Sequence, residues 1–284
     1  MTDDGPTLAG LVALLTAWLD RLMPAGTRQA ALVAALTARF GADASPVTAQ
    51  GVAAVESEAR RHSRHLALYH EPSGALPPDT ESRGWPPMDP AVVRARAAHV
   101  TRVERRSGGA CVIRLTDLDP VDLAEPYVEA AFALAEGATR IVLDLRDNGG
   151  GDPATVALIC GRLLGVTELS TVVYRDREHR WTTPAGRWLR QPLDVLVSAR
   201  TFSSGEALAY HLQSRGRAMV YGETTPGAAD HVTPIRLLPT VRAELPEAFV
   251  VDTVSGTNWE GVGVVPDLPC PETQALNHAL EAGR

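Results

Sequence analysis

Two apolar strand patterns, each followed by a short turn and a helix, constrain the fold of this chain more than any other feature. The segments "RIVLDLRD" (140–147) and "LDVLVSA" (193–199) consist mainly of apolar residues that do not alternate with polar ones. Such runs are typical of strands buried on both faces of a parallel sheet. Helix and strand patterns alternate around them from about residue 98 onward. The alternation predicts an α/β domain with a mostly parallel β-sheet core and flanking helices.

The first 63 residues have a different pattern. Apolar residues recur at helical spacing in "LAGLVALLTAWLDRLM" and "RQAALVAALTARF", and "VTAQGVAAVESEARRHS" makes a third helical segment. We therefore expect a small N-terminal three-helix domain over residues 1–63. A strand pattern and a Pro/Gly-rich linker follow over residues 64–97, and the α/β core takes up residues 98–284.

Charge and composition argue against several kinds of partner. The chain has 284 residues, a formal net charge of −7 and no basic stripe, so we expect no nucleic acid partner. Its three cysteines form no C-x-x-C pair, which predicts neither a disulfide framework nor a zinc site. The first apolar stretch follows Asp3 and Asp4 and is interrupted at Asp20, unlike a signal peptide or a membrane span. We expect a cytoplasmic protein without a membrane partner.

Two adjacent serines stand between the second apolar strand and a helix, in "ARTFSSGEALAYHL". Ser203 and Glu206 fit the S-x-x-E capping box, so one interpretation is that the serines only cap the helix. The other is that one serine is a nucleophile, because a helix N-terminus offers backbone N–H groups that stabilise developing negative charge.

Three consecutive glycines follow the first apolar strand, in "IVLDLRDNGGGDP". Glycines allow a tight strand-to-helix turn, and they also let backbone N–H groups approach a ligand closely. The segment is therefore either a simple turn or a source of an oxyanion-hole donor.

Three blocks in order, "LDLRDNGGG", "VLVSARTFSSGEALAYHLQSRGRAMVYGETTPG" and "GTNWEGVGVVPD", resemble the C-terminal processing (tail-specific) serine peptidases. The resemblance extends from about residue 98 to 271 and is weaker around His65. It points to the branch that includes the tricorn core protease and the interphotoreceptor retinoid-binding protein. It implies a crotonase-like, ββα-type protease core. The short linker leaves no room for the PDZ domain of many relatives.

The resemblance also assigns site residues. It makes Ser203 the nucleophile and gives the backbone N–H groups of Ser204 and Gly150 to the oxyanion hole. Gly149 and Gly227 are implied to contact substrate.

The general base divides the family into two branches. In one, a lysine pairs with the serine, but its position here is Ala228, which excludes that mechanism. The other branch uses a histidine and a glutamate, which match His65 and Glu260. The serine that precedes this histidine in the tricorn-like pattern is Arg64 here, while Ser63 lies one residue earlier. His231 is the reserve candidate for the base.

These observations predict a serine hydrolase, most of all a peptidase that forms an acyl-enzyme on Ser203. Its base would be His65, supported by Glu260. A peptide or a small-molecule acyl compound would be the substrate, no metal or organic cofactor is implied, and a homo-oligomer is one option. Two alternatives stay open: a protein that binds small apolar ligands on the same fold, and an esterase or cyclase of a natural-product pathway.

Overall fold

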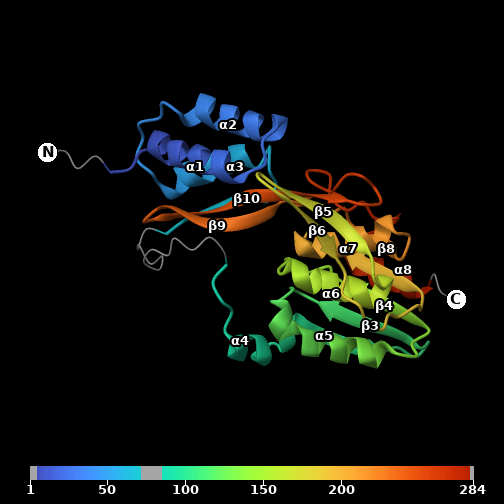
Figure 1. Cartoon of the computed structure of the whole chain (residues 1–284). Coiled ribbons are helices and arrows are strands. Elements are labelled where there is room, and N and C mark those ends of the chain that lie inside the picture. The colour runs from blue at the N-terminus through green and yellow to red at the C-terminus, as the bar shows by residue number, and fades with distance from the viewer. Residues whose placement is uncertain (1–4, 72–84, 282–284) are drawn as a thin grey trace. The chain divides into compact units, whose positions relative to one another are not determined.

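The computed structural model describes residues 5–71 and 85–281 (Figure 1). The chain divides into two compact units, which are described one at a time. The first comprises Met1–Pro86, Val172–His179 and Asp230–Val250, and the second comprises Pro87–Thr171, Arg180–Ala229 and Val251–Arg284. The domain boundaries predicted around residues 64–97 stay a prediction, because residues 72–84 lie outside the described part of the chain.

The first unit contains the three N-terminal helices expected from the sequence: α1 (Leu8–Leu22), α2 (Thr27–Phe40) and α3 (Ala49–Ala59). The hydroxyls of Thr7 and Thr48 begin α1 and α3, since each accepts a backbone N–H of the first turn. No helix in residues 5–71 and 85–281 is both long and apolar enough to cross a membrane.

The helices of this unit pack on strands β1 (Ala67–His70), β9 (His231–Leu238) and β10 (Val241–Asp252). Both β1 and β9 pair with β10 in antiparallel register. Fully buried leucines of α1 and α2 form one apolar cluster with Leu68 of β1 and with five residues of the β9–β10 hairpin: Ile235, Leu237, Val241, Ala243 and Leu245. The helices and the hairpin therefore share a single core.

The second unit is built on a six-stranded sheet with the order β11-β8-β7-β4-β3-β2. From β11 to β3 the neighbours are parallel, and only β2 is antiparallel to β3, which confirms a mostly parallel core sheet. In chain order the strands are β2 (Val100–Arg105), β3 (Ala110–Leu115), β4 (Arg140–Asp144), β7 (Leu193–Val197), β8 (Met219–Gly222) and β11 (Leu268–Pro269).

Helices flank this sheet, as the sequence predicts. They are α4 (Pro90–Ala95), α5 (Val121–Ala135), α6 (Pro153–Leu164), α7 (Ser204–Ser214) and α8 (Glu272–Glu281). The last of these packs its buried alanines, Ala275 and Ala279, against one face of the sheet. The side chains of Ile141, Leu143 and Val195 on the other face are buried as well. Burial on both faces explains why these strands are apolar throughout.

A second sheet has the order β1-β10-β5-β6, with β9 added on β10. It contains β5 (Glu168–Tyr174) and β6 (Glu178–Thr182) besides the strands of the hairpin. From the sequence, all of residues 98–284 are expected in one α/β core, and this sheet is not separated from it. The two-residue connection makes β9 and β10 antiparallel, and β10 joins the second sheet because it pairs with β1 and β5, which lie far from it in the chain.

Candidate active site

Ser203 stands at the first position before α7, in a strained backbone conformation with φ 51° and ψ −119°. Positive φ costs a non-glycine residue about 1–3 kcal/mol and persists only where neighbours enforce it. Its side chain is partly buried. A serine at a sharp turn between a sheet strand and a helix is the arrangement that presents a nucleophilic hydroxyl in several hydrolase folds.

The turn before Ser203 is fixed to the segment that follows β4. Thr201 Oγ1 donates to the carbonyl oxygen of Leu145 at 2.8 Å, and Ser198 Oγ donates to that of Arg146 at 2.5 Å. The N–H of Phe202 donates to the carbonyl oxygen of Asn148 at 2.9 Å. The serine turn and the glycine turn are therefore held together by hydrogen bonds.

Asn148 is fully buried at the start of the glycine turn. Its Nδ2 donates to the carbonyl oxygen of Leu115 at 3.1 Å, and its Oδ1 accepts the N–H of Gly150 at 3.0 Å. The sequence analysis did not single out this residue. An asparagine directly before glycines is a common turn signal, and that signal was available.

Gly150 faces the serine directly. A Cβ at this position would lie 2.8 Å from Ser203 Cβ and 3.3 Å from Ser203 Oγ, and its φ of +112° also favours glycine. In this structure its N–H donates to Asn148 Oδ1, so its share in an oxyanion hole stays a prediction. The N–H of Gly149, the predicted substrate contact, donates to the carbonyl oxygen of Thr116 at 3.2 Å.

The second serine has a different environment. The side chain of Ser204 is buried, and its Oγ donates to the carbonyl oxygen of Gly151 at 2.7 Å. Its hydroxyl thus ties α7 to the glycine turn. Its backbone N–H lies in the first turn of the helix and has no intrahelical acceptor.

Glu206 is fully buried, and its carboxylate accepts the N–H of Ser203 at 2.9 Å. This contact is the glutamate half of the predicted capping box. The same carboxylate also accepts from Thr225, Gly227 and Ala228, which the sequence analysis missed.

Glu260 and Gly227 belong to two loops that lie against each other in the second unit. Glu260 Oε2 accepts the N–H of Ala229 at 2.8 Å. The carbonyl oxygen of Gly227 accepts the N–H of Gly261 at 2.8 Å. A Cβ on Gly227 would lie 2.8 Å from the backbone nitrogen of Gly263, so only glycine fits. Its predicted contact with substrate stays a prediction.

His65 belongs to the first unit and lies in the turn before β1, which begins at Ala67. Its Nδ1 is 2.5 Å from the carbonyl oxygen of Asp230. Because a carbonyl only accepts, Nδ1 carries the proton, and Nε2 is then the basic nitrogen of the neutral ring. Burial lowers the pKa of His65.

Asp230 organises the surroundings of this histidine, and sequence reasoning gave it no such role. Its buried carboxylate accepts from Arg28 Nη2 at 2.6 Å and from Ser63 Oγ at 2.8 Å. Ser63 is fully buried, whereas Arg64 is exposed. Next to Asp230, the reserve candidate His231 begins β9, and its role as a base stays a prediction.

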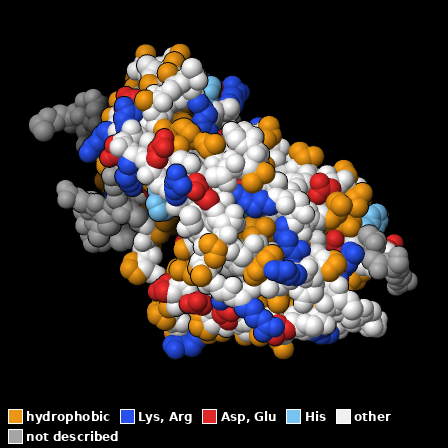
Figure 2. Space-filling model, turned by 45° about the vertical axis from the view of Figure 1, so that its right-hand side comes forward, with side chains coloured by type: hydrophobic (Ala, Val, Ile, Leu, Met, Phe, Trp, Pro, Cys, Tyr) orange, Lys and Arg blue, Asp and Glu red, His pale blue; other side chains and the backbone are white. Residues whose placement is uncertain are grey.

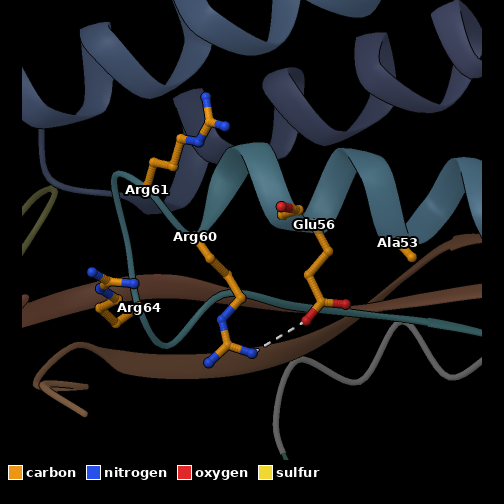
Figure 3. A pocket seen from close by; sticks show the side chains of 6 residues that line it. Ala53, Glu56, Arg60, Arg61 and Arg64 are labelled. Atoms are coloured by element: carbon orange, nitrogen blue, oxygen red, sulfur yellow. Dashed lines mark hydrogen bonds and ion pairs between the residues drawn. The ribbon is translucent and has the colours of Figure 1, made fainter.

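A cavity of about 500 Å³ lies beside α3 and is lined by Ala53, Glu56, Ser57, Arg60, Arg61 and Arg64 (Figure 3). The guanidinium groups of Arg60 and Arg61 point to opposite sides of the helix, and each pairs with a glutamate of α3. The cavity therefore does not direct its positive charges at one point. Figure 2 likewise shows basic and acidic side chains mixed over the face that it displays.

The profile of Peptidase family S41 matches residues 109–270, more than half of the chain, and the chain therefore belongs to this family of serine-type peptidases. The match includes Ser203, Glu206, Gly150 and Glu260, while His65 lies outside it. The resemblance to C-terminal processing peptidases inferred from the sequence is confirmed.

The chain is 32% identical over 143 residues to carboxyl-terminal-processing peptidase 1, chloroplastic, of Arabidopsis thaliana. That match covers 48% of this chain and 29% of the relative. It is also 40% identical over 93 residues to a carboxyl-terminal-processing protease of Picosynechococcus. That match covers 32% of this chain and 22% of the relative. The chain thus spans less than a third of these relatives.

The fold is similar to that of a candidate peptidase from Parabacteroides merdae. The TM-score is 0.67 at 13% identity, over 98% of this chain and 97% of the other. This likeness supports the architecture alone. The cytoplasmic location, the possible homo-oligomer and the membership of the tricorn branch stay predictions.

Proposed function

We propose that the chain cleaves peptides through an acyl-enzyme on Ser203, with His65 as general base and Glu260 as supporting acid. The observation that carries the proposal is the strained Ser203 at the start of α7, facing Gly150 inside the region matched by the S41 family. The family supports the class of reaction, and the assignment of roles to residues is our inference.

In the first step, Ser203 Oγ forms a bond to the carbonyl carbon of the peptide while His65 Nε2 takes its proton. The C–N bond then breaks, and the imidazolium returns the proton to the leaving amine. Water, deprotonated by the same nitrogen, releases the acyl group and restores the serine. The N–H of Ser204 would stabilise the oxyanion, joined by that of Gly150 once it leaves Asn148 Oδ1.

The absence of a lysine base strengthens the choice of histidine. The sequence contains no lysine at all, and the N–H of Ala228, at the position of the family's lysine, donates to Glu206. A histidine with a protonated Nδ1 and a lowered pKa has the properties of a base at neutral pH.

The test compares the wild type with Ser203→Ala on a pool of peptides, half with free and half with amidated C-termini, by mass spectrometry. We expect wild-type cleavage to fall by at least about 1,000-fold in the variant, because the nucleophile is gone. Ser107→Ala is the matched control and keeps the activity, because Ser107 is exposed in the turn between β2 and β3. If Ser203→Ala cleaves the peptides as fast as the wild type, the choice of nucleophile is wrong. If neither the wild type nor a variant cleaves any peptide, the ligand-binding or esterase alternatives are favoured.

A further inference from the structure

The carboxylate of Glu206 does more than cap a helix. Oε2 accepts from the N–H groups of Ser203 and Ala228, each at 2.9 Å. Oε1 accepts from Thr225 Oγ1 at 2.6 Å and from the N–H of Gly227 at 2.7 Å. Only one of the four donors belongs to the turn that the carboxylate would cap. The other three come from a loop about twenty residues further along the chain.

The donors arranged around Glu206 favour its ionised form. Thr225 Oγ1 accepts the N–H of Val264 at 2.7 Å and donates to Glu206. Four donors match the four lone-pair positions of an ionised carboxylate. Burial raises the pKa of Glu206, and the four donors oppose that rise.

The loop held by Glu206 continues directly into the partners of the other proposed catalytic residues. The N–H of Ala229, one residue after Ala228, donates to Glu260. The carbonyl oxygen of Asp230, one residue further, accepts from His65 Nδ1. Within residues 225–230, three residues therefore contact Glu206, Ala229 contacts Glu260 and Asp230 contacts His65. Glu206 itself contacts the backbone of the serine.

We propose that Glu206 is a positioning residue of the reaction: its carboxylate holds the strained Ser203 backbone and fixes the loop whose next residues orient Glu260 and His65. The inference rests on the proposed function, since it needs Ser203 to be the nucleophile. It goes beyond a helix cap, because loss of a cap alone lowers stability without selectively lowering the rate of the chemical step.

The test measures kcat and KM on a peptide cleaved by the wild type, and the rate at which a fluorophosphonate labels Ser203. Glu206→Gln keeps the shape but replaces one acceptor oxygen by an NH₂ group, which faces N–H donors. We expect kcat and the labelling rate to fall about 100-fold while KM changes less than about threefold, because misplaced reacting groups lower the rate rather than ground-state binding.

Asp194→Asn is the matched control. Asp194 is a buried carboxylate in β7 of the same unit and pairs with Arg140 at 2.6 Å. We expect this variant to lose stability while kcat and the labelling rate stay within about twofold of the wild type. Melting curves of both variants separate a lower rate from a lower folded fraction.

A second pair of variants decides the case in which Glu206→Gln does not fold. Thr225→Val removes one of the four donors, and Thr225→Ser keeps it. A lower kcat in Thr225→Val that Thr225→Ser restores supports the inference, whereas unchanged kcat in Thr225→Val overturns it.

An unchanged kcat and an unchanged labelling rate in a folded Glu206→Gln variant also overturn the inference that Glu206 is a positioning residue. If the wild type is itself neither labelled nor active, the proposed function fails, and the role of Glu206 falls with it.

Discussion

At the scale of single residues, the site depends on polar groups whose hydrogen-bond roles are fixed by their neighbours. His65 illustrates this, because a backbone carbonyl decides which of its nitrogens carries the proton. Gly150 illustrates the opposite case, since its N–H is directed at Asn148 rather than at a substrate. In the proposed mechanism, the first contact prepares the base, and the second bond must break before Gly150 can donate to an oxyanion.

The lowered pKa of His65 gives a pH prediction. In the proposed mechanism the neutral ring of His65 is the active form, and an ordinary histidine is half protonated at about pH 6.5. Because burial favours the neutral form, the acid limb of kcat/KM should lie below that pH, so that activity persists at about pH 6. A kcat/KM profile between about pH 4.5 and 8 checks this, and an acid limb above pH 6.5 contradicts it.

At the scale of helices and strands, one carboxylate begins two helices. Asp152 Oδ1 accepts the N–H of Ala154 in the first turn of α6, at 3.0 Å. Its Oδ2 accepts the N–H of Val121, the first residue of α5, at 2.7 Å. The residue before Val121 is Pro120, whose side chain offers no acceptor. Asp152 therefore supplies the cap that α5 lacks.

We expect Asp152→Ala to lower the free energy of unfolding by about 2 kcal/mol, the upper end for a single cap, because two helix starts lose an acceptor. Urea denaturation measures the change through the midpoint at constant slope. Asp89→Ala is the control, because Asp89 caps only the six-residue α4, and its cost should be about 1 kcal/mol or less. Equal costs for the two variants contradict the double cap.

At the scale of the whole molecule, the chain passes repeatedly between the two units, since each contains three separate segments. The apolar core of the first unit combines the N-terminal helices with the hairpin β9–β10, which lies far along the sequence. Residues 1–63 and the hairpin therefore stabilise each other.

A truncated protein without residues 1–63 tests this shared core. Removal of residues 1–63 exposes the apolar side chains that the hairpin buries against the helices, among them Ile235, Leu237 and Leu245. We expect the shortened protein to aggregate or to bind a hydrophobic dye, because burial of such side chains contributes about 1.5–3 kcal/mol each. A monomeric product with a cooperative melting transition contradicts this prediction and supports a separate core domain.

The sequence by itself predicted the elements whose signals are local. Apolar runs identified the buried strands of the core, periodicity identified α1, α2 and α3, and turn residues placed Ser203 and Gly150 after two of the buried strands. These features follow from side-chain patterns over a few residues, so a single sequence contains them.

Only the tertiary structure decided which groups meet. The contacts of Glu206 with Thr225, and of Asp230 with Ser63 and Arg28, join residues that are far apart in the chain and leave no local pattern. The separate sheet of β9 and β10 is of the same kind, because strand pairing depends on partners that sequence periodicity does not name. A buried polar group needs a hydrogen-bond partner, but only the folded chain determines which one it finds.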